Sequence, residues 1–328
     1  MRWIAVAYGA LLAGCATAAP RPIDMGGDAS CVIAPADKAF IEGGLAAWAY
    51  AEGGIARLKP AERRPHYVLF DGACQYDSLD GATWTAAWHD GKRVRIPLPG
   101  GTSEVGPVAF TAPMPDGNSM ALVALPSVWR TIPQFEERLG DRLDVFLTSV
   151  FVHEMTHTRE TWIRAMRSAP WAEVFRREGL SSETVQDRFA SNAEFVAGIA
   201  REKQLLFEAA ETLDRQKARQ ALEAMRARRA KWFVGDNAKY AEVEDVFLAT
   251  EGVAVLVQYF WLADPRGAGW TAEQAMKQSR DGSGVWALDE GFALMLAVDR
   301  LVPDWRSRVF SEPSATALDL LALAAGET

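Results

Sequence analysis

The spacing of hydrophobic residues changes near residue 130 of this chain. Before that point short apolar runs alternate with polar residues and turns, whereas after Pro133 apolar residues recur every three or four positions over long stretches. Alternation with a period of two is typical of strands, and the longer period is typical of amphipathic helices. The pattern predicts an α+β fold, with a small, mostly antiparallel sheet at 31–130 and a large helical part at 131–328.

The N-terminal part is expected to hold one helix and several strands. The helix is expected at 37–58, and the strands at 67–70, 83–89, 93–98, 108–111 and 120–125. Asp90-Gly91 separates two of these strands and is a strong signal for a type I′ hairpin that pairs them.

Helices are expected throughout the C-terminal part. Their ranges are 143–167, 181–212, 214–232, 242–263, a short one after Thr271, 286–301 and 315–325. Ser181 or Ser182, Asp214 and Thr271 are the expected N-caps. The helix at 214–232 carries a basic run, which predicts a solvated face rather than a lipid contact. The apolar stretch 246–263 contains Glu251 and is short for a membrane span, so a buried core helix is expected.

Composition and charge narrow the function classes. The 328 residues are 49% hydrophobic, which is enough for a substantial core, and the net charge is −8 with a pI near 5.2. A nucleic-acid-binding protein would concentrate basic residues on one surface. Nucleic acid is therefore not an expected partner.

The first residues have the character of a targeting segment. Arg2 precedes an apolar run at 4–12, and Leu12-Ala13-Gly14-Cys15 resembles a bacterial lipobox. The resemblance implies a signal peptide at 1–14 and a tether at 15–30. It also implies that Cys15 is lipidated and anchors the protein to a membrane, with the protein facing the periplasm. An ordinary signal peptide is the alternative.

Export leaves two further cysteines in an oxidising compartment. Cys31 and Cys74 are an even pair, so one disulfide is expected, with two free thiols as the alternative. A cysteine-ligated zinc is not expected, because the chain has no CxxC spacing.

One motif carries most of the chemistry. His153-Glu154-Met155-Thr156-His157 reads HExxH within the helix expected at 143–167. Positions i and i+4 share one face of a helix, so both imidazoles can bind a single ion. Glu154 lies beside the first histidine, where it can act as general base on a metal-bound water. The alternative is a pair of surface histidines beside a solvated glutamate.

The motif and its uncharged neighbours resemble the zincin metallopeptidases. Those neighbours are Val150, Phe151, Val152, Met155, Thr156 and Thr158, whereas Arg159 departs from the hydrophobic residue often found there. The resemblance implies a zinc peptidase in which Glu154 is the catalytic base. It also implies that an edge strand before the helix binds an extended peptide, and 119–125 is the expected strand.

A third ligand is needed to complete a catalytic zinc site. No histidine follows His157, which excludes the metzincin arrangement and favours a carboxylate, as in the gluzincins. Glu251 is the preferred ligand because it is the only residue between Val246 and Trp261 that is charged at neutral pH, and burial of this charge without a partner would cost several kcal/mol. Its Glu-Gly-x-Ala surroundings also resemble the gluzincin third-ligand helix.

Other residues stay open as ligands or helpers. Glu290 occurs in a near copy of this pattern, and Glu194 lies on a charged helix. Glu160 is expected to pair with Arg164 four residues on. His66 and His89 are not expected at the site. Tyr259, two turns after Glu251, is expected to pack in the core rather than to stabilise an oxyanion.

Three functions are compatible with these features. The first is a membrane-anchored zinc peptidase that hydrolyses peptide bonds in the cell envelope. The second is a non-catalytic zinc-binding lipoprotein that acts as a binding or assembly factor. The third is a structural envelope lipoprotein in which HExxH is incidental. An intact Glu154 favours the first, because metal binding alone does not require that residue.

Overall fold

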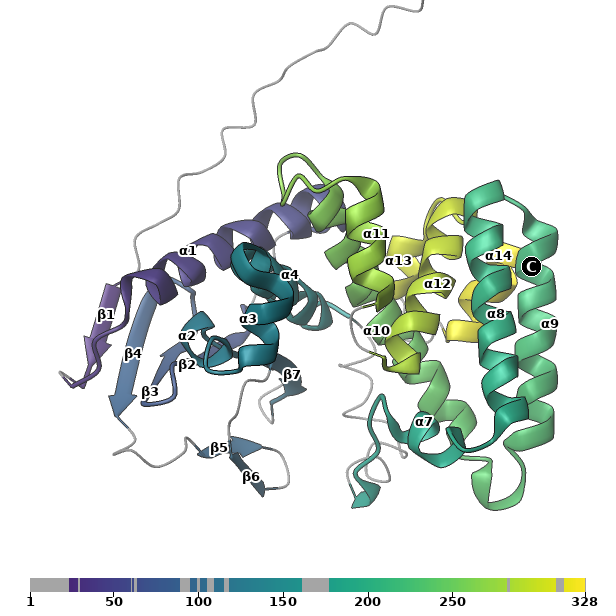
Figure 1. Ribbon diagram of the computed structural model, residues 1–328, viewed down its shortest axis with the longest axis horizontal. Helices are drawn as coiled ribbons and strands as arrows, with labels where there is room; N and C mark the ends of the chain where they lie inside the picture. The colour runs from purple at the N-terminus through teal and green to yellow at the C-terminus, as the bar shows by residue number, and fades with distance from the viewer. Residues whose placement is uncertain are drawn as a thin grey trace, which may run out of the picture.

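The protein has an α+β fold, as the hydrophobic pattern predicts (Figure 1). The computed structural model describes residues 24–28, 30–59, 61, 64–88, 95–98, 101–104, 109–114, 118–160, 177–281, 284–310 and 316–327. A small sheet with a helix across it forms the N-terminal part, and a bundle of helices follows. Residues 1–14, His89, the Asp90-Gly91 turn and Arg164 lie outside the described residues.

The main sheet has the strand order β1-β4-β3-β2-β8-β7. Its strands are β1 (Asp24–Gly27), β2 (His66–Phe70), β3 (Cys74–Ser78), β4 (Thr83–Trp88), β7 (Ala109–Pro113) and β8 (Ser119–Ala124). β1 pairs with β4 and β2 with β8 in parallel, whereas the other neighbours are antiparallel. The sheet is therefore mixed, with more antiparallel than parallel pairings.

Three expectations about the strands need correction. The strand expected to follow a turn at Asp90-Gly91, β5 (Arg95–Leu98), pairs with β6 (Gly101–Glu104) in a separate two-stranded sheet and not with β4. β4 already has β3 and β1 on its two sides. β1 lies within the segment expected to be a tether. β8, the expected substrate-binding edge, lies between β2 and β7, so within the described residues β7 is the edge strand near the helical part.

Helix α1 (Pro35–Tyr50) and the turns after the sheet lead to the motif helix. α1 continues as a short π-helix, η1 (Ala51–Ile55). After β8 come α2 (Pro126–Trp129), α3 (Pro133–Leu139), the 3₁₀ turn η2 (Gly140–Arg142) and α4 (Leu143–His157). α4 lies between the sheet and the helical bundle (Figure 1). The ring of Phe151 on α4 stacks on Tyr67 of β2, with centroids 6.5 Å apart.

The helical bundle contains the expected helices, except that one of them is divided into two. Its elements are α7 (Thr184–Phe189), α8 (Ala193–Thr212), α9 (Arg215–Trp232), the 3₁₀ turn η3 (Gly235–Asn237), α10 (Tyr240–Ala263), α11 (Ala272–Asp281), α12 (Trp286–Leu301), α13 (Trp305–Phe310) and α14 (Ala317–Ala325). The helix expected at 181–212 is two helices, because the Asn192 side chain accepts the N–H of Phe195 and starts α8 afresh. Asp214 and Thr271 are N-caps, as expected.

α10 is the central helix of the bundle. Among the described residues one helical stretch, Gly235–Ala263, has the length and hydropathy of a membrane-crossing helix, yet 72% of its most apolar window is buried inside the protein. This burial is the arrangement of a core helix.

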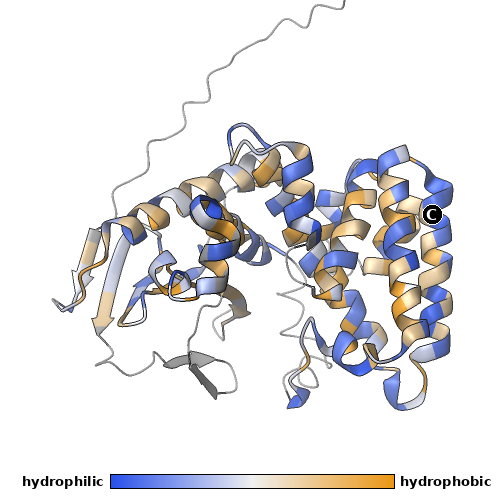
Figure 2. Cartoon of the chain, viewed as in Figure 1, coloured by the Kyte–Doolittle hydropathy of each residue, from blue (hydrophilic) through white to orange (hydrophobic). Residues whose placement is uncertain are grey.

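The basic run on α9 is only partly solvated, which corrects the expectation of a solvated face. Hydrophilic residues lie along the outer side of α9 (Figure 2). Arg228 and Arg229, however, are buried in ion pairs with Glu202, Glu244 and Asp245. Arg215 and Arg219 instead donate to carbonyl oxygens at the ends of α12 and α14.

The expected disulfide is present. Cys31 and Cys74 are joined, with their Cα atoms 5.9 Å apart. The bond ties the segment before α1 to the first residue of β3. It therefore holds α1 to the sheet on which α4 packs.

Candidate metal centre

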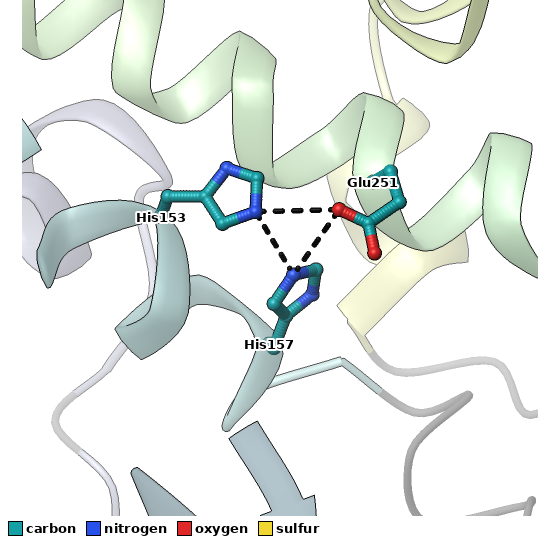
Figure 3. Close-up of side chains that lie close together, drawn as sticks. All are labelled: His153, His157 and Glu251. Atoms are coloured by element: carbon teal, nitrogen blue, oxygen red, sulfur yellow. Dashed lines mark hydrogen bonds and ion pairs between the residues drawn. The ribbon is translucent and has the colours of Figure 1, made fainter. Parts of the chain in front are cut away.

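The three expected ligands lie together (Figure 3). Nε2 of His153 lies 3.2 Å from Nε2 of His157 and 3.3 Å from Oε2 of Glu251. The same carboxylate oxygen lies 3.7 Å from Nε2 of His157. Both histidines are buried, and the Glu251 side chain is 16% exposed. The sequence-predicted set therefore converges on one point that stays partly accessible to solvent.

Two helices position these side chains. The histidines lie one turn apart in the last two turns of α4, and Glu251 projects towards them from α10. A partly buried hydrogen bond also joins these helices, because Nε2 of Gln258 on α10 donates to Oγ of Ser149 on α4 at 2.8 Å. Ser149 lies one turn before His153, so this bond holds the helices together beside the site.

The donor set and its spacing fit a tetrahedral metal ion. Two imidazole nitrogens and a carboxylate oxygen form a set that Zn²⁺ accepts, with a fourth position left for water or substrate. At bond lengths of about 2.0–2.1 Å, tetrahedral donors lie about 3.3–3.4 Å from one another. The observed separations of 3.2, 3.3 and 3.7 Å bracket that range. The residues could therefore hold such an ion without a large rearrangement.

Glu154 is buried beside the histidines and faces the edge strand. The hydroxyl of Thr111 on β7 lies 2.8 Å from the Glu154 carbonyl oxygen and 3.2 Å from its Oε2. Burial raises the pKa of Glu154, and the neighbouring His153 and His157 offset only part of this effect. A carboxyl group in this environment is a candidate general base.

The pKa values of Glu251 and His157 shift in the opposite sense to what burial alone would cause. Burial by itself raises the pKa of Glu251, but hydrogen bonds and charge interactions with His153 and His157 outweigh it and lower that pKa. Burial by itself lowers the pKa of His157, but Glu160 and Glu251 outweigh it and raise that pKa well above its usual range. Glu251 and His157 thus favour each other's charged forms.

The competing ligands lie elsewhere. Glu290 is buried near Arg228, with 3.8 Å between its Oε1 and Nη2 of the arginine. Glu194 is exposed and forms an ion pair with Lys231. His66 pairs with Asp77 at 2.9 Å within the sheet. These three positions do not contribute to the cluster.

Tyr259 packs in the core, as expected. Its ring contacts Phe260 and Phe292, with centroids 5.3 and 5.5 Å away. It is therefore a packing residue.

Glu160 is a residue of the site that sequence reasoning missed. Its side chain is 1% exposed, and its Oε2 lies 3.3 Å from Nδ1 of His157. The helix expected at 143–167 ends at His157, and a tight turn brings Glu160 back towards the ring. The expectation of a surface pair with Arg164 assumed a continuous helix, which α4 is not. The spacing of Glu160 three residues after His157 was the available signal.

The chain shows no likeness that would assign the site. Comparison with protein-family models, with curated proteins and with solved structures finds no match. The function is therefore inferred from the geometry and chemistry of the site itself.

Proposed function

We propose that this protein is a zinc-dependent peptidase of the bacterial cell envelope. The observation that carries the proposal is the convergence of His153, His157 and Glu251 beside the buried carboxyl group of Glu154. A purely structural role does not call for two histidines, a third donor and a candidate base around one point.

The residues have distinct roles in the proposed reaction. His153, His157 and Glu251 would hold zinc, which when bound polarises a carbonyl group and makes water more acidic. Glu154 accepts the proton of the attacking water and then gives it to the leaving nitrogen of the peptide bond, so it acts first as base and then as acid. Thr111 orients Glu154 from the edge strand.

The position of β7 supports an extended peptide as substrate. Within the described part of the sheet, β7 pairs only with β8, so its other edge offers backbone groups for pairing. Thr111 on this strand touches Glu154, which places the free edge next to the candidate base. A peptide that adds to β7 as a further strand would pass the site.

An envelope location rests on two features. The lipobox-like sequence Leu12-Ala13-Gly14-Cys15 supports a lipid anchor at Cys15. The Cys31–Cys74 disulfide is a bond that persists in exported proteins and is rare in the cytosol. Labelling of cells with a radioactive fatty acid tests the anchor, because Cys15→Ser should abolish label on this protein.

The decisive experiment combines metal analysis with a peptide-library assay. Purified protein should contain one zinc per chain and cleave fluorogenic peptides in a reaction that a chelator stops and zinc restores. Glu154→Gln should keep the zinc and lose at least about 100-fold in kcat, the usual scale for removing a general base. Undiminished turnover by this variant rejects the mechanism.

The same measurements test the alternatives. Stoichiometric zinc without cleavage of any library peptide would support a non-catalytic zinc-binding factor. If the protein binds no zinc after incubation with the metal, HExxH is an incidental motif and a structural envelope lipoprotein is the function that remains.

A further inference from the structure

The chain tightens immediately after the second histidine of the motif. The backbone N–H groups of Thr158, Arg159 and Glu160 each bond to the carbonyl oxygen three residues earlier, at 3.2, 2.9 and 3.3 Å. In such 3₁₀ geometry side chains at i and i+3 are eclipsed, whereas in an α-helix they are offset around the axis. The tight turn therefore places the Glu160 side chain directly against the His157 ring.

Glu160 contacts Nδ1 of His157, the ring nitrogen on the side away from the other two candidate ligands. Oε2 of Glu160 lies 3.3 Å from Nδ1 of His157, while Nε2 of the same ring faces His153 and Glu251. A neutral imidazole has one N–H and one lone pair. When Nδ1–H is donated to Glu160, the lone pair lies on Nε2, on the side of the other two donors.

A second contact fixes the turn from outside. Arg159 forms an ion pair with Glu52 and donates from Nη2 to the carbonyl oxygen of Lys59 at 2.9 Å. Glu52 lies on the π-helix η1 and is buried. The turn that carries Glu160 is thus tied to the segment that continues α1, and Arg159, which departs from the zincin pattern, has a structural role.

We propose that Glu160 is a positioning residue of the metal centre, which orients His157 and fixes its Nε2 as the metal-binding nitrogen. The inference rests on the proposed zinc site but not on peptidase activity. Buried carboxylates behind metal-binding histidines raise ligand basicity, and their removal typically weakens metal binding about 10–100-fold. Glu160 carries this role from the motif helix itself, three residues after the ligand.

The test compares zinc affinity in three variants of the full chain. Glu160→Ala should raise the Kd for Zn²⁺, measured by competition with a chromophoric chelator, by about 10–100-fold. Glu160→Gln, which keeps an acceptor oxygen but no charge, should fall between this variant and the wild type. Asp77→Asn is the matched control, because Asp77 forms the same kind of histidine–carboxylate pair away from the site, and it should bind zinc normally.

Spectroscopy separates positioning from loss of fold. The ¹⁵N shifts of His157 in the zinc-loaded protein should report a protonated Nδ1 and a metal-bound Nε2, a pattern that Glu160→Ala should disturb, and the visible spectrum of the Co²⁺ protein should change in Glu160→Ala but not in Asp77→Asn. Thermal unfolding of the metal-free forms checks that Glu160→Gln is folded. Wild-type zinc affinity in Glu160→Ala overturns the inference and leaves the proposed peptidase intact. If Glu160→Ala binds zinc more weakly but the wild type cleaves no peptide, the inference about Glu160 stands and the proposed peptidase function fails.

Discussion

Gly252 of α10 and Gly291 of α12 lie backbone to backbone where the two helices cross. A Cβ atom on Gly252 would come within 2.3 Å of the Gly291 carbonyl oxygen, and one on Gly291 within 2.7 Å of the Leu248 carbonyl oxygen. Each glycine follows a glutamate, and the two glutamates diverge from the crossing. Glu251 reaches the histidines, whereas Glu290 reaches the buried ion pairs of Arg228. The repeated Glu-Gly pair is thus a packing motif in which one glutamate serves the candidate metal centre.

Gly252→Ala should therefore destabilise the protein and weaken zinc binding together. The added methyl group forces α10 and α12 apart, at a cost of about 1–3 kcal/mol or more, and the movement displaces the neighbouring Glu251. Urea unfolding and zinc titration measure the two effects.

The control for this substitution is Gly43→Ala on α1, where a Cβ meets nothing within 4 Å. It should stabilise the helix by about 0.5–1 kcal/mol and leave zinc affinity unchanged. Normal zinc binding in Gly252→Ala would show that the crossing does not position Glu251.

The sequence predicted those parts of the site that depend on local geometry. His153 and His157 share a helix, and the cost of burying a lone charge in an apolar helix singled out Glu251. Glu290, in a near copy of the same pattern, stayed open as an alternative, because the local sequence does not give the direction that each glutamate takes from the α10–α12 crossing. The contact of Glu160 with His157 was not predicted, because it depends on where α4 ends.

The same distinction holds for the fold: features set by neighbouring residues were predictable, and features set by contacts distant in sequence were not. The N-caps Asp214 and Thr271 follow from short patterns, and the structure confirms them. The helix expected at 143–167, in contrast, ends at His157, and the helix expected at 181–212 is divided in two. Strand pairing depends on partners that lie far apart in sequence: β8 is interior because β2 pairs with one of its sides, and β1 occupies the side of β4 that a hairpin with β5 would need. The burial of Arg228 likewise depends on acids of α8 and α10 that no local pattern connects to α9.

Arg228→Met should be among the most destabilising single changes in the bundle. The guanidinium group bonds to Glu202 and Glu244, all with nearly buried side chains, so its removal leaves acids without a partner. Loss of one member of a buried ion pair costs about 3–5 kcal/mol. Lys231→Met, on the same helix but in the exposed pair with Glu194, should cost about 1 kcal/mol or less. Equal losses in the two variants, measured by denaturant unfolding, would contradict this reading.

Glu290 should make the protein less stable as the pH rises. Burial and the nearby Glu202 raise the pKa of Glu290 well above its usual range, and Arg228 offsets only part of this effect. The unfolded chain loses this proton near pH 4.3, about the ordinary glutamate pKa, whereas the folded chain keeps it to higher pH. Because the folded state then binds more protons, stability falls with rising pH in this window.

Glu290→Gln removes that dependence. Its free energy of unfolding relative to the wild type should increase as the pH rises above about 4.3, until the folded-state pKa of Glu290 is passed. Denaturant titrations at several pH values measure the difference. Parallel stability curves for the two proteins would rule out a protonated Glu290.

Reduction of the Cys31–Cys74 disulfide should loosen the sheet part. The two cysteines are 43 residues apart, and a loop of this length corresponds to about 4 kcal/mol in the chain-entropy estimate. A Cys31→Ala/Cys74→Ala double variant should lose about 2–4 kcal/mol of unfolding free energy. Added reductant should lower the stability of the wild type and leave the double variant unaffected. A wild type that is indifferent to reductant would contradict this expectation.

Thr111 links the edge strand to the candidate base. Its single hydroxyl hydrogen can be donated either to the Glu154 carbonyl oxygen at 2.8 Å or to Oε2 at 3.2 Å. Thr111→Val keeps the shape of the side chain and removes this donor. A hydrogen bond to a charged group contributes about 1.5–3 kcal/mol, so kcat for peptide cleavage should fall about 10–100-fold with zinc content unchanged.

Thr111→Ser separates the hydroxyl group from the rest of the side chain. It retains the donor and loses only a methyl group, so it should keep most of the wild-type kcat. Steady-state kinetics with one library-derived peptide, together with metal analysis of each variant, provide the comparison. If Thr111→Ser loses as much activity as Thr111→Val, packing of β7 against α4, and not the hydrogen bond, controls the position of Glu154.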